Sequence, residues 1–279
     1  MRLCSIRVNG EAHLGVVTTR GIVDATAAGY RNTMDDVIAG AERAALTAIE
    51  SNAALPCVDA PEYLNIVNRP GKLVCVGLNY RAHAEKVDLK SAEVPILFSK
   101  FADALVPTGA DVTLPDWEDS YDYEAELVIV IGRRAWDVTE AEAEKCIFGY
   151  TCGNDLSCRA PQKRTSQWLI GKTMPGFGPC GPCIATADSL DPGAGRRIRS
   201  WVNGELRQDG STADMIHSCA NIVSYASRYI ALEPGDLIFT GTPSGVALEK
   251  HGEEQQWLRP GDVVDVEIEG IGRLTNKMV

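Results

Sequence analysis

The chain has 279 residues, 45% of them hydrophobic and 23% charged, as in an ordinary globular protein with a large core. A net charge of −11 and a pI near 4.9 argue against nucleic acid and anionic membranes as partners, and no apolar run approaches the ~20 residues of a spanning helix. Nine cysteines, an odd number, and the lack of a signal-peptide pattern predict a cytoplasmic protein without a disulfide framework.

Residues 1–69 are predicted to form a small N-terminal α/β region. Asn9-Gly10 is a hairpin turn signal between short strands. Apolar residues then recur at helical spacing from Met34 to Ile49, behind a capping box of Thr33 and Asp36. Prolines between residues 51 and 70 mark a soft boundary.

Residues 70–279 are predicted to form a larger catalytic domain, made mainly of strands. In its first half, strands are expected at residues 72–80, 95–100, 110–115, 121–132 and 146–153. A polar, lid-like segment lies between the first two strands. Thr139 and Glu142 cap a short helix, and the last of these strands ends in a turn at Asn154-Asp155.

The second half contains a hairpin with its turn at Asn203-Gly204 and a helix running from Met215 to Ile230. Two Pro-Gly-Asp turns, at Pro234 and Pro260, each introduce a strand. Because strands and helices do not alternate regularly, the pattern predicts an α+β fold dominated by β-sheet.

Two familiar motifs are set aside. Cys180-Gly181-Pro182-Cys183 matches a thioredoxin-type redox pair, but that chemistry needs its first cysteine exposed at a helix N-terminus, and the sequence that follows predicts strand and turn. Residues 176–181 fit G-x-G-x-x-G, yet two prolines and the absence of a following helix indicate a loop instead of a dinucleotide site.

Glu124 and Glu126 stand two apart at the head of the apolar run 127–131, with Asp122 at the same period. In a strand these carboxylates project from one face, where their mutual repulsion favours a cation among them. From spacing alone, the solvated face of an edge strand is the commoner explanation. Val128 and Val130 continue the same face, however, and predict that it turns toward the core.

Other candidate residues have ordinary explanations beside functional ones. Asp155 stands where a strand meets a turn and could add a third carboxylate, although Asn-Asp is common turn chemistry. Lys172 precedes a glycine-proline loop, where a surface lysine is the more common case. His83 lies in the polar lid-like segment, and Thr242 lies in a loop that could bind a carboxylate or simply make a turn.

Taken together, several short stretches resemble the fumarylacetoacetate hydrolase family, in order and spacing, over roughly residues 70–279. The matching stretches are Gly77-Leu78-Asn79-Tyr80 with His83, Asp122-Tyr123-Glu124-Ala125-Glu126-Leu127, Gly149-Tyr150, Asn154-Asp155, Gln167-Trp168, Gly171-Lys172, Val202-Asn203-Gly204, Leu232-Glu233-Pro234-Gly235-Asp236, Thr240-Gly241-Thr242-Pro243 and Ile268-Glu269-Gly270-Ile271-Gly272. Each motif is weak alone, whereas the ordered set is highly specific.

The resemblance implies a rolled mixed β-sandwich, assembled as a homodimer, that acts on small anionic 2-oxo acids without an organic cofactor. It implies Mg2+ or Mn2+ held by Glu124, Glu126 and Asp155, since hard cations prefer carboxylates. The metal and Lys172 would stabilise an enolate formed by bond cleavage beside the ketone. The substrate or the metal shell would be contacted by Arg159, Gln162 and Thr242.

One departure concerns the general base. Relatives often carry a lid histidine followed three residues later by glutamate, and these residues share a face of a helix. Here Lys86 occupies that place, and Glu85 stands two residues after His83. On a regular helix Glu85 would point about 200° away from the histidine.

The leading hypothesis is a metal-dependent hydrolase that splits a C–C bond in a short 2,4-diketo acid, an acylpyruvate or fumarylpyruvate, as in aromatic catabolism. His83 would be the base, assisted by Glu85. The altered lid favours an alternative on the same metal and lysine: decarboxylation or tautomerisation of oxaloacetate, or isomerisation of a related 2-oxo diacid. A more remote alternative is a metal-binding protein without turnover.

Overall fold

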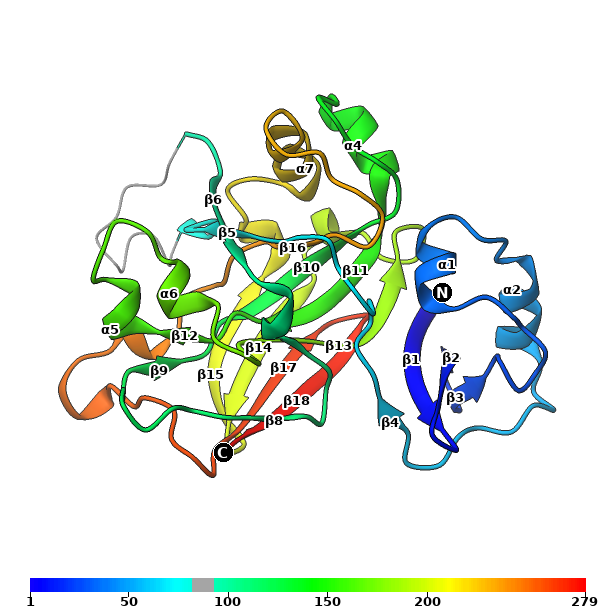
Figure 1. Cartoon of the computed structure of the whole chain (residues 1–279), viewed down its shortest axis with the longest axis horizontal. Coiled ribbons are helices and arrows are strands. Elements are labelled where there is room, and N and C mark those ends of the chain that lie inside the picture. The colour runs from blue at the N-terminus through cyan, green and yellow to red at the C-terminus, as the bar shows by residue number, and fades with distance from the viewer. Residues whose placement is uncertain (82–92) are drawn as a thin grey trace.

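The computed structural model describes residues 1–81 and 93–279. Over these ranges the chain forms two large sheets with a few short helices around them (Figure 1). The predicted class, an α+β fold dominated by strands, is confirmed. Among the helices of these residues, none has the length and apolar character needed to cross a membrane.

The N-terminal region begins with a meander of β1 (Arg2–Val8), β2 (Glu11–Thr18) and β3 (Gly21–Asp24). The hairpin turn predicted at Asn9-Gly10 is confirmed, with φ of +51° and +85° at the two residues, as a tight turn of this kind requires. A later short strand, β4 (Glu62–Tyr63), also pairs with β1.

The single helix predicted from Met34 to Ile49 is wrong in extent. The chain forms α1 (Met34–Ile38) and α2 (Ala44–Ser51), and between them Gly40 has a φ of +106°, outside the helical region. The capping box is confirmed, because Thr33 and Asp36 exchange side-chain-to-backbone hydrogen bonds at the start of α1.

The larger sheet is mixed and runs in the order β3-β2-β1-β13-β11-β10-β16-β5-β6. Its remaining members are β5 (Leu73–Gly77), β6 (Ile96–Lys100), β7 (Leu105–Val106, which pairs with β13), β10 (Ala125–Ile131), β11 (Ile147–Asn154), β13 (Gly178–Thr186) and β16 (Leu237–Phe239). Pairing of β1 with β13 makes the N-terminal region continuous with the rest of the sheet. A domain boundary at residues 69–70 stays a prediction.

A second sheet, in the order β15-β14-β17-β18-β8, packs against β10, β11 and β13 and completes a sandwich (Figure 1). Its strands are β8 (Asp111–Val112), β14 (Arg197–Val202), β15 (Glu205–Ser211), β17 (Val263–Ile268) and β18 (Gly272–Met278). The hairpin predicted at Asn203-Gly204 joins β14 to β15. A separate pair consists of β9 (Tyr121–Asp122) and β12 (Ser157–Cys158).

The acidic strand predicted at residues 121–132 is interrupted. Asp122 belongs to β9, whereas Glu126 lies near the start of β10, and the chain between them is not part of a strand. The inward face is confirmed: Val128 and Val130 are fully buried in one hydrophobic cluster, while the alternate residues of β10 enter another.

The loop predicted at residues 176–181 is also wrong, because β13 begins at Gly178. Pro179 pairs with β7, and Pro182 falls at an irregularity in the pairing with β11. The sheet needs no backbone N–H from Pro182 at that position, so the proline is tolerated. Cys180 and Cys183 are buried within this strand, and burial raises the pKa of both thiols, that of Cys183 to about 12. The redox interpretation therefore stays excluded.

Helices cover the ends of the sandwich. α4 (Glu140–Cys146) has the predicted capping box and packs against α7 (Cys219–Ser227) (Figure 1). α7 begins later than predicted, because Met215 makes a β-bridge with Tyr80 and Ser218 caps the first turn. The other helices of the described residues are α5 (Arg159–Gln162), α6 (Leu169–Lys172) and the 3-10 turns η1 (Ala102–Ala104), η2 (Pro192–Ala194), η3 (Thr212–Asp214), η4 (Ala247–Glu249) and η5 (Gly252–Glu254).

Candidate metal and active site

Three buried carboxylates meet where β10 begins and β11 ends. Oxygen atoms of Glu124, Glu126 and Asp155 all lie within 4.8 Å of one another. The antiparallel register brings them together, since Ala125 stands opposite Asn154 and the Asp155 N–H donates to the Glu124 carbonyl at 2.9 Å. Residues predicted from two separate stretches of sequence therefore form one cluster.

Lys172 lies inside this cluster and not on the surface, where the lysine's local sequence alone would place it. Only 2% of it is exposed, and its Nζ lies 2.8 Å from Glu124 Oε2 and 2.7 Å from Asp155 Oδ2. Burial alone would lower the lysine pKa, but the charges of Asp155 and Glu124 together outweigh burial and raise it. The ammonium group is therefore positively charged at neutral pH.

A second lysine, Lys100, was missed by sequence reasoning. Its buried Nζ lies 2.6 Å from Asp155 Oδ1 and donates to the carbonyls of Leu156 and Phe177, at 3.1 and 2.8 Å, and to that of Lys172. The sequence offered one indication of this lysine, namely its position at the end of the mainly apolar strand β6. Lys100 thus holds the segments that carry Asp155 and Lys172.

Glu126 is the carboxylate with the least compensation. Its Oε2 accepts from the Gly241 N–H at 2.8 Å, and the side chain is buried. Burial first, then the charges of Asp155 and Glu124, raises its pKa well above the ordinary range.

These residues fit a hard divalent cation. Buried Asp155 Oδ1 makes no hydrogen bond of good geometry to any residue in the described ranges, although Lys100 is close. The three candidate ligands are all carboxylates, one of their oxygens makes no hydrogen bond, and Glu126 lies close to the like charges of Asp155 and Glu124. Such a set suits Mg2+ or Mn2+ better than a softer ion.

Arg159 links the cluster to Asp122. Its Nη2 lies 2.6 Å from Glu124 Oε1 and 2.8 Å from Asp122 Oδ2, and its Nη1 donates to Gln162 Oε1 at 3.0 Å. Asp122 also accepts the N–H groups of Ala247 and Leu248. Asp122 therefore supports the site through Arg159 and stays outside the triad, and Gln162 borders the same arginine.

Thr242 is buried beside β10. Its hydroxyl donates to the Ala125 carbonyl and accepts from Gln208 Nε2, both at 2.8 Å, so its side chain is occupied. Gln208, a residue that the sequence did not single out, also accepts from the Ala125 N–H. Within the described ranges the Thr242 backbone N–H has no acceptor and could meet a substrate carboxylate.

An aromatic pair borders the lysine. Phe98 meets Trp168 edge to face, with centroids 5.4 Å apart, and the Lys172 Nζ lies 5.3 Å from the Phe98 centroid. A Cβ at Gly77 would collide with the Trp168 ring. The predicted base residues His83 and Glu85 lie outside the described residues.

Comparisons with known proteins agree with this geometry. The family model "Fumarylacetoacetate (FAA) hydrolase C-terminal" matches residues 72–279. Human "Oxaloacetate tautomerase FAHD2A, mitochondrial" is 37% identical over 231 residues, which cover 81% of this chain and 73% of that protein.

Two solved structures are similar as well. A fumarylacetoacetate hydrolase from Exiguobacterium antarcticum has a TM-score of 0.88 and 35% identity, covering 100% of this chain and 99% of that one. The fumarylpyruvate hydrolase from Pseudomonas aeruginosa, in complex with Mn2+ and pyruvate, has a TM-score of 0.68 and 35% identity, over 75% of this chain and 90% of that one.

Proposed function

The chain belongs to the fumarylacetoacetate hydrolase family, and on that premise we propose that it is a divalent-metal-dependent hydrolase of short 2,4-diketo acids. The bond cleaved is the C–C bond of an acylpyruvate or fumarylpyruvate. The observation that carries this proposal is the buried triad with Lys172 across two of its members. The complex of a similar hydrolase with Mn2+ and pyruvate supports it.

The metal, Mg2+ or Mn2+, would be held by Glu124, Glu126 and Asp155 and would supply Lewis-acid polarisation of the 2-oxo group. Lys172 then has a defined task, because its fixed charge next to the triad stabilises the negative charge that develops on the pyruvate half as the bond breaks. A preorganised buried charge acts strongly, since little water screens it.

Substrate positioning is assigned to the residues around this centre. Arg159 with Gln162 forms one side, and the Thr242 loop offers a backbone N–H to the substrate carboxylate. His83, assisted by Glu85, is proposed to activate the attacking water.

A second function has support of its own. A human relative, 37% identical, is an oxaloacetate tautomerase. Tautomerisation moves a proton without a nucleophilic water, and in this chain it would use the same metal and Lys172. Decarboxylation of oxaloacetate and isomerisation of related diacids need the same groups. The displaced lid glutamate favours this alternative.

The test is an assay of the purified protein with Mg2+ or Mn2+ on acetylpyruvate and fumarylpyruvate, and in parallel on oxaloacetate. We expect the absorbance of a diketo acid to fall as pyruvate appears. Rapid oxaloacetate turnover without hydrolysis of either diketone would replace the first function by the second.

Homodimer assembly and cytoplasmic location belong to the same proposal, because they rest on family resemblance and composition. Light scattering of the purified protein tests the first, and a mass near twice 30.1 kDa is expected.

A further inference from the structure

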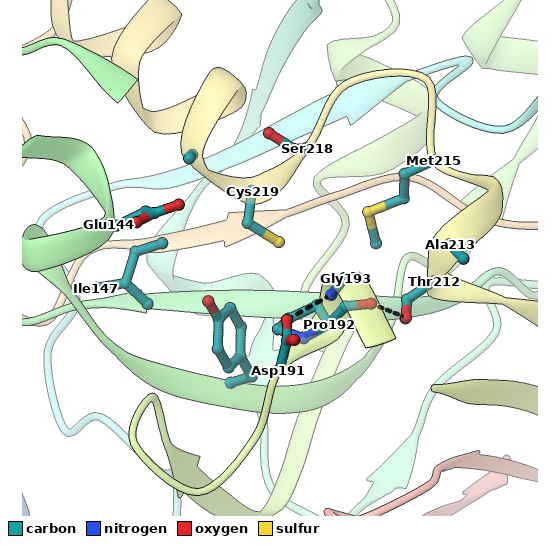
Figure 2. Close-up of a pocket in the computed structure, with 12 residues that line it drawn as sticks. Glu144, Ile147, Asp191, Pro192, Gly193, Thr212, Ala213, Met215, Ser218 and Cys219 are labelled. Atoms are coloured by element: carbon teal, nitrogen blue, oxygen red, sulfur yellow. Dashed lines mark hydrogen bonds between the residues drawn. The ribbon is translucent and has the colours of Figure 1, made fainter. Parts of the chain in front are cut away.

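A cavity of about 290 Å3 lies apart from the metal carboxylates, between α4, η2, η3 and the start of α7. Figure 2 shows Cys219 and Met215 pointing toward Asp191 and Pro192 across it, with Ile147 on the α4 side. The mechanism above uses none of these residues.

Two acidic residues line the cavity, Asp191 on one side and Glu144 on the α4 side (Figure 2). Glu144 and Asp191 are the charged residues that line it, and no lysine or arginine of the described ranges does. Asp191 Oδ1 accepts from the Gly193 N–H at 2.8 Å, which leaves Oδ2 for a ligand (Figure 2). Arg196 donates to the Asp191 carbonyl at 3.1 Å but does not line the cavity. The Asp191 carboxylate suits an ammonium group.

Across the cavity from Asp191, the start of α7 carries partial positive charge (Figure 2). The nine-residue helix α7 begins here, and the Ser218 hydroxyl accepts only the Asn221 N–H, at 3.1 Å. The N–H groups of Cys219 and Ala220, the first two helical residues, have no intrahelical acceptor, and both residues line the cavity. A helix N-terminus of this kind favours a carboxylate.

Tyr150 gives an independent sign of a ligand. Only 6% of it is exposed, it lines the cavity, and its hydroxyl makes no hydrogen bond within residues 1–81 and 93–279. Burial raises its pKa, and the charges of Cys219, Asp191 and Glu144 add to the effect. Tyr150 lines the cavity, and its hydroxyl keeps accessible surface, stays protonated and lacks a partner in the described ranges. This hydroxyl, at the end of a side chain that is otherwise buried, is available to donate to a ligand in the cavity.

A path of contacts joins this cavity to the metal site. Met215 makes a β-bridge with Tyr80, and the next two residues, Ile216 and His217, donate their N–H groups to Asn79, each at 2.7 Å. Asn79 Nδ2 donates in turn to the Thr240 carbonyl at 2.8 Å, and the following Gly241 N–H donates to Glu126 Oε2, also at 2.8 Å.

We propose that this cavity binds a small free α-amino acid with an apolar side chain, and that its occupancy changes the affinity of the metal site. The ammonium group lies at Asp191, the carboxylate at the start of α7, and the side chain against Ile147 and Met215. This effector site is additional to the proposed reaction.

The first experiment is calorimetric titration of the full chain at pH 7 with L-valine, L-leucine and L-methionine. Two matched probes each remove one charge of leucine: 3-methylbutylamine lacks the carboxylate, and 4-methylpentanoate lacks the ammonium group. We expect at least one amino acid to bind, and leucine to bind at least tenfold tighter than either matched probe. Binding of none of the three amino acids, or equal binding of a single-charge probe, overturns the proposal.

The second experiment uses variants. Asp191→Asn keeps an oxygen for the Gly193 N–H but removes the charge, and Tyr150→Phe removes only the hydroxyl. Each should weaken the tightest amino acid at least tenfold with unchanged circular dichroism. Glu253→Gln removes the same charge from the exposed η5 turn and should leave the affinity unaltered. Parental affinity in both cavity variants would refute the site.

The third experiment measures coupling without turnover. The Kd for Mn2+, followed by electron paramagnetic resonance, should change at least threefold at saturating amino acid, and should not change in Asp191→Asn. Binding of the amino acid with an unaltered Kd for Mn2+ overturns the effector role. Failure of every hydrolysis assay would leave this outcome untouched, so the two proposals fail separately.

Discussion

Asp155 forms ion pairs with two lysines at once, with Lys172 at Oδ2 and with Lys100 at Oδ1. All three side chains are buried, so none of these charges can be hydrated in place of its partner. Removal of one member of a buried ion pair leaves the other uncompensated, which is far more destabilising than losing a surface pair. The site therefore contributes to the stability of the fold as well as to chemistry.

Lys100→Met tests this directly. The substitution leaves three carbonyls without their donor and Asp155 without one of its two charge partners, and we expect the free energy of unfolding to fall by about 3–5 kcal/mol in urea titrations without metal. Lys277→Met, on the exposed face of β18, is the matched control and should change it by less than about 0.5 kcal/mol. Similar losses in both variants would show that Lys100 does not stabilise the fold through these contacts.

Glu126→Ala should abolish metal binding and activity. Replacing an outer-shell partner of a metal site typically costs 10–100-fold in affinity, so loss of a ligand should exceed about 100-fold for Mn2+ in calorimetry. Without metal, the Tm of the variant should fall by no more than the loss of side-chain packing explains. The substitution also removes a carboxylate whose buried charge is unfavourable, as its raised pKa indicates. An active, metal-independent variant would refute the proposed ligand.

His83→Ala separates the two proposed reactions. If His83 activates water, its loss should reduce kcat for diketo-acid hydrolysis by about 100-fold or more, whereas oxaloacetate tautomerisation should change little. Both rates are measured on one preparation with saturating Mg2+. Equal losses would remove the water-activating role.

At the scale of elements, the features that local chemistry decides were predictable. The Asn9-Gly10 turn and the Thr33 and Thr139 capping boxes need only neighbouring residues, and all three are present. The start of α7 was not, because contacts with Tyr80, far away in the chain, draw Met215 out of the helix. Likewise β13 is a strand despite its prolines, since strands on both sides hold it.

Gly77, the last residue of β5, leaves room for the Trp168 ring beside the metal site. A methyl group there collides with Trp168, so Gly77→Ala should push this ring off Phe98, which lies against Lys172. We expect a loss of about 1–3 kcal/mol in stability and a lower kcat/KM.

The smaller ring of a Trp168→Phe substitution should recover part of that loss in the double variant. A double-mutant cycle on thermal unfolding measures the coupling. Additive effects would show that the two residues do not act through this contact.

At the scale of the molecule, the carboxylate triad could be foreseen because two adjacent strands carry it in short motifs. Lys100 and Gln208 could not, because the fold brings them to β10 and β11 from distant strands with no motif around them. The N-terminal region also shares a core with the catalytic sheet, since Leu3 and Met34 lie in one hydrophobic cluster with Val128.

Metal should stabilise the whole chain. An ion that binds only the folded state at 100 times its Kd contributes about 2.7 kcal/mol, which corresponds to a rise in Tm of about 5–10 °C for a chain of this size. Differential scanning fluorimetry with Mn2+ and with a chelator measures it, and Glu126→Ala should show no rise. An equal rise in that variant would place the ion elsewhere.

The inward face of β10 carries Glu126 and then Val128 and Val130 on one period. A slip of one residue in the pairing with β11 would move all three to the opposite face of β10, which packs in a different hydrophobic cluster. Misfolded molecules therefore cannot keep the carboxylate in place while losing the core, or the reverse. Metal affinity therefore reports correct strand pairing, and in a library of variants that keep Glu124, Glu126 and Asp155 the fraction of molecules that bind Mn2+ should follow the fraction that is natively folded.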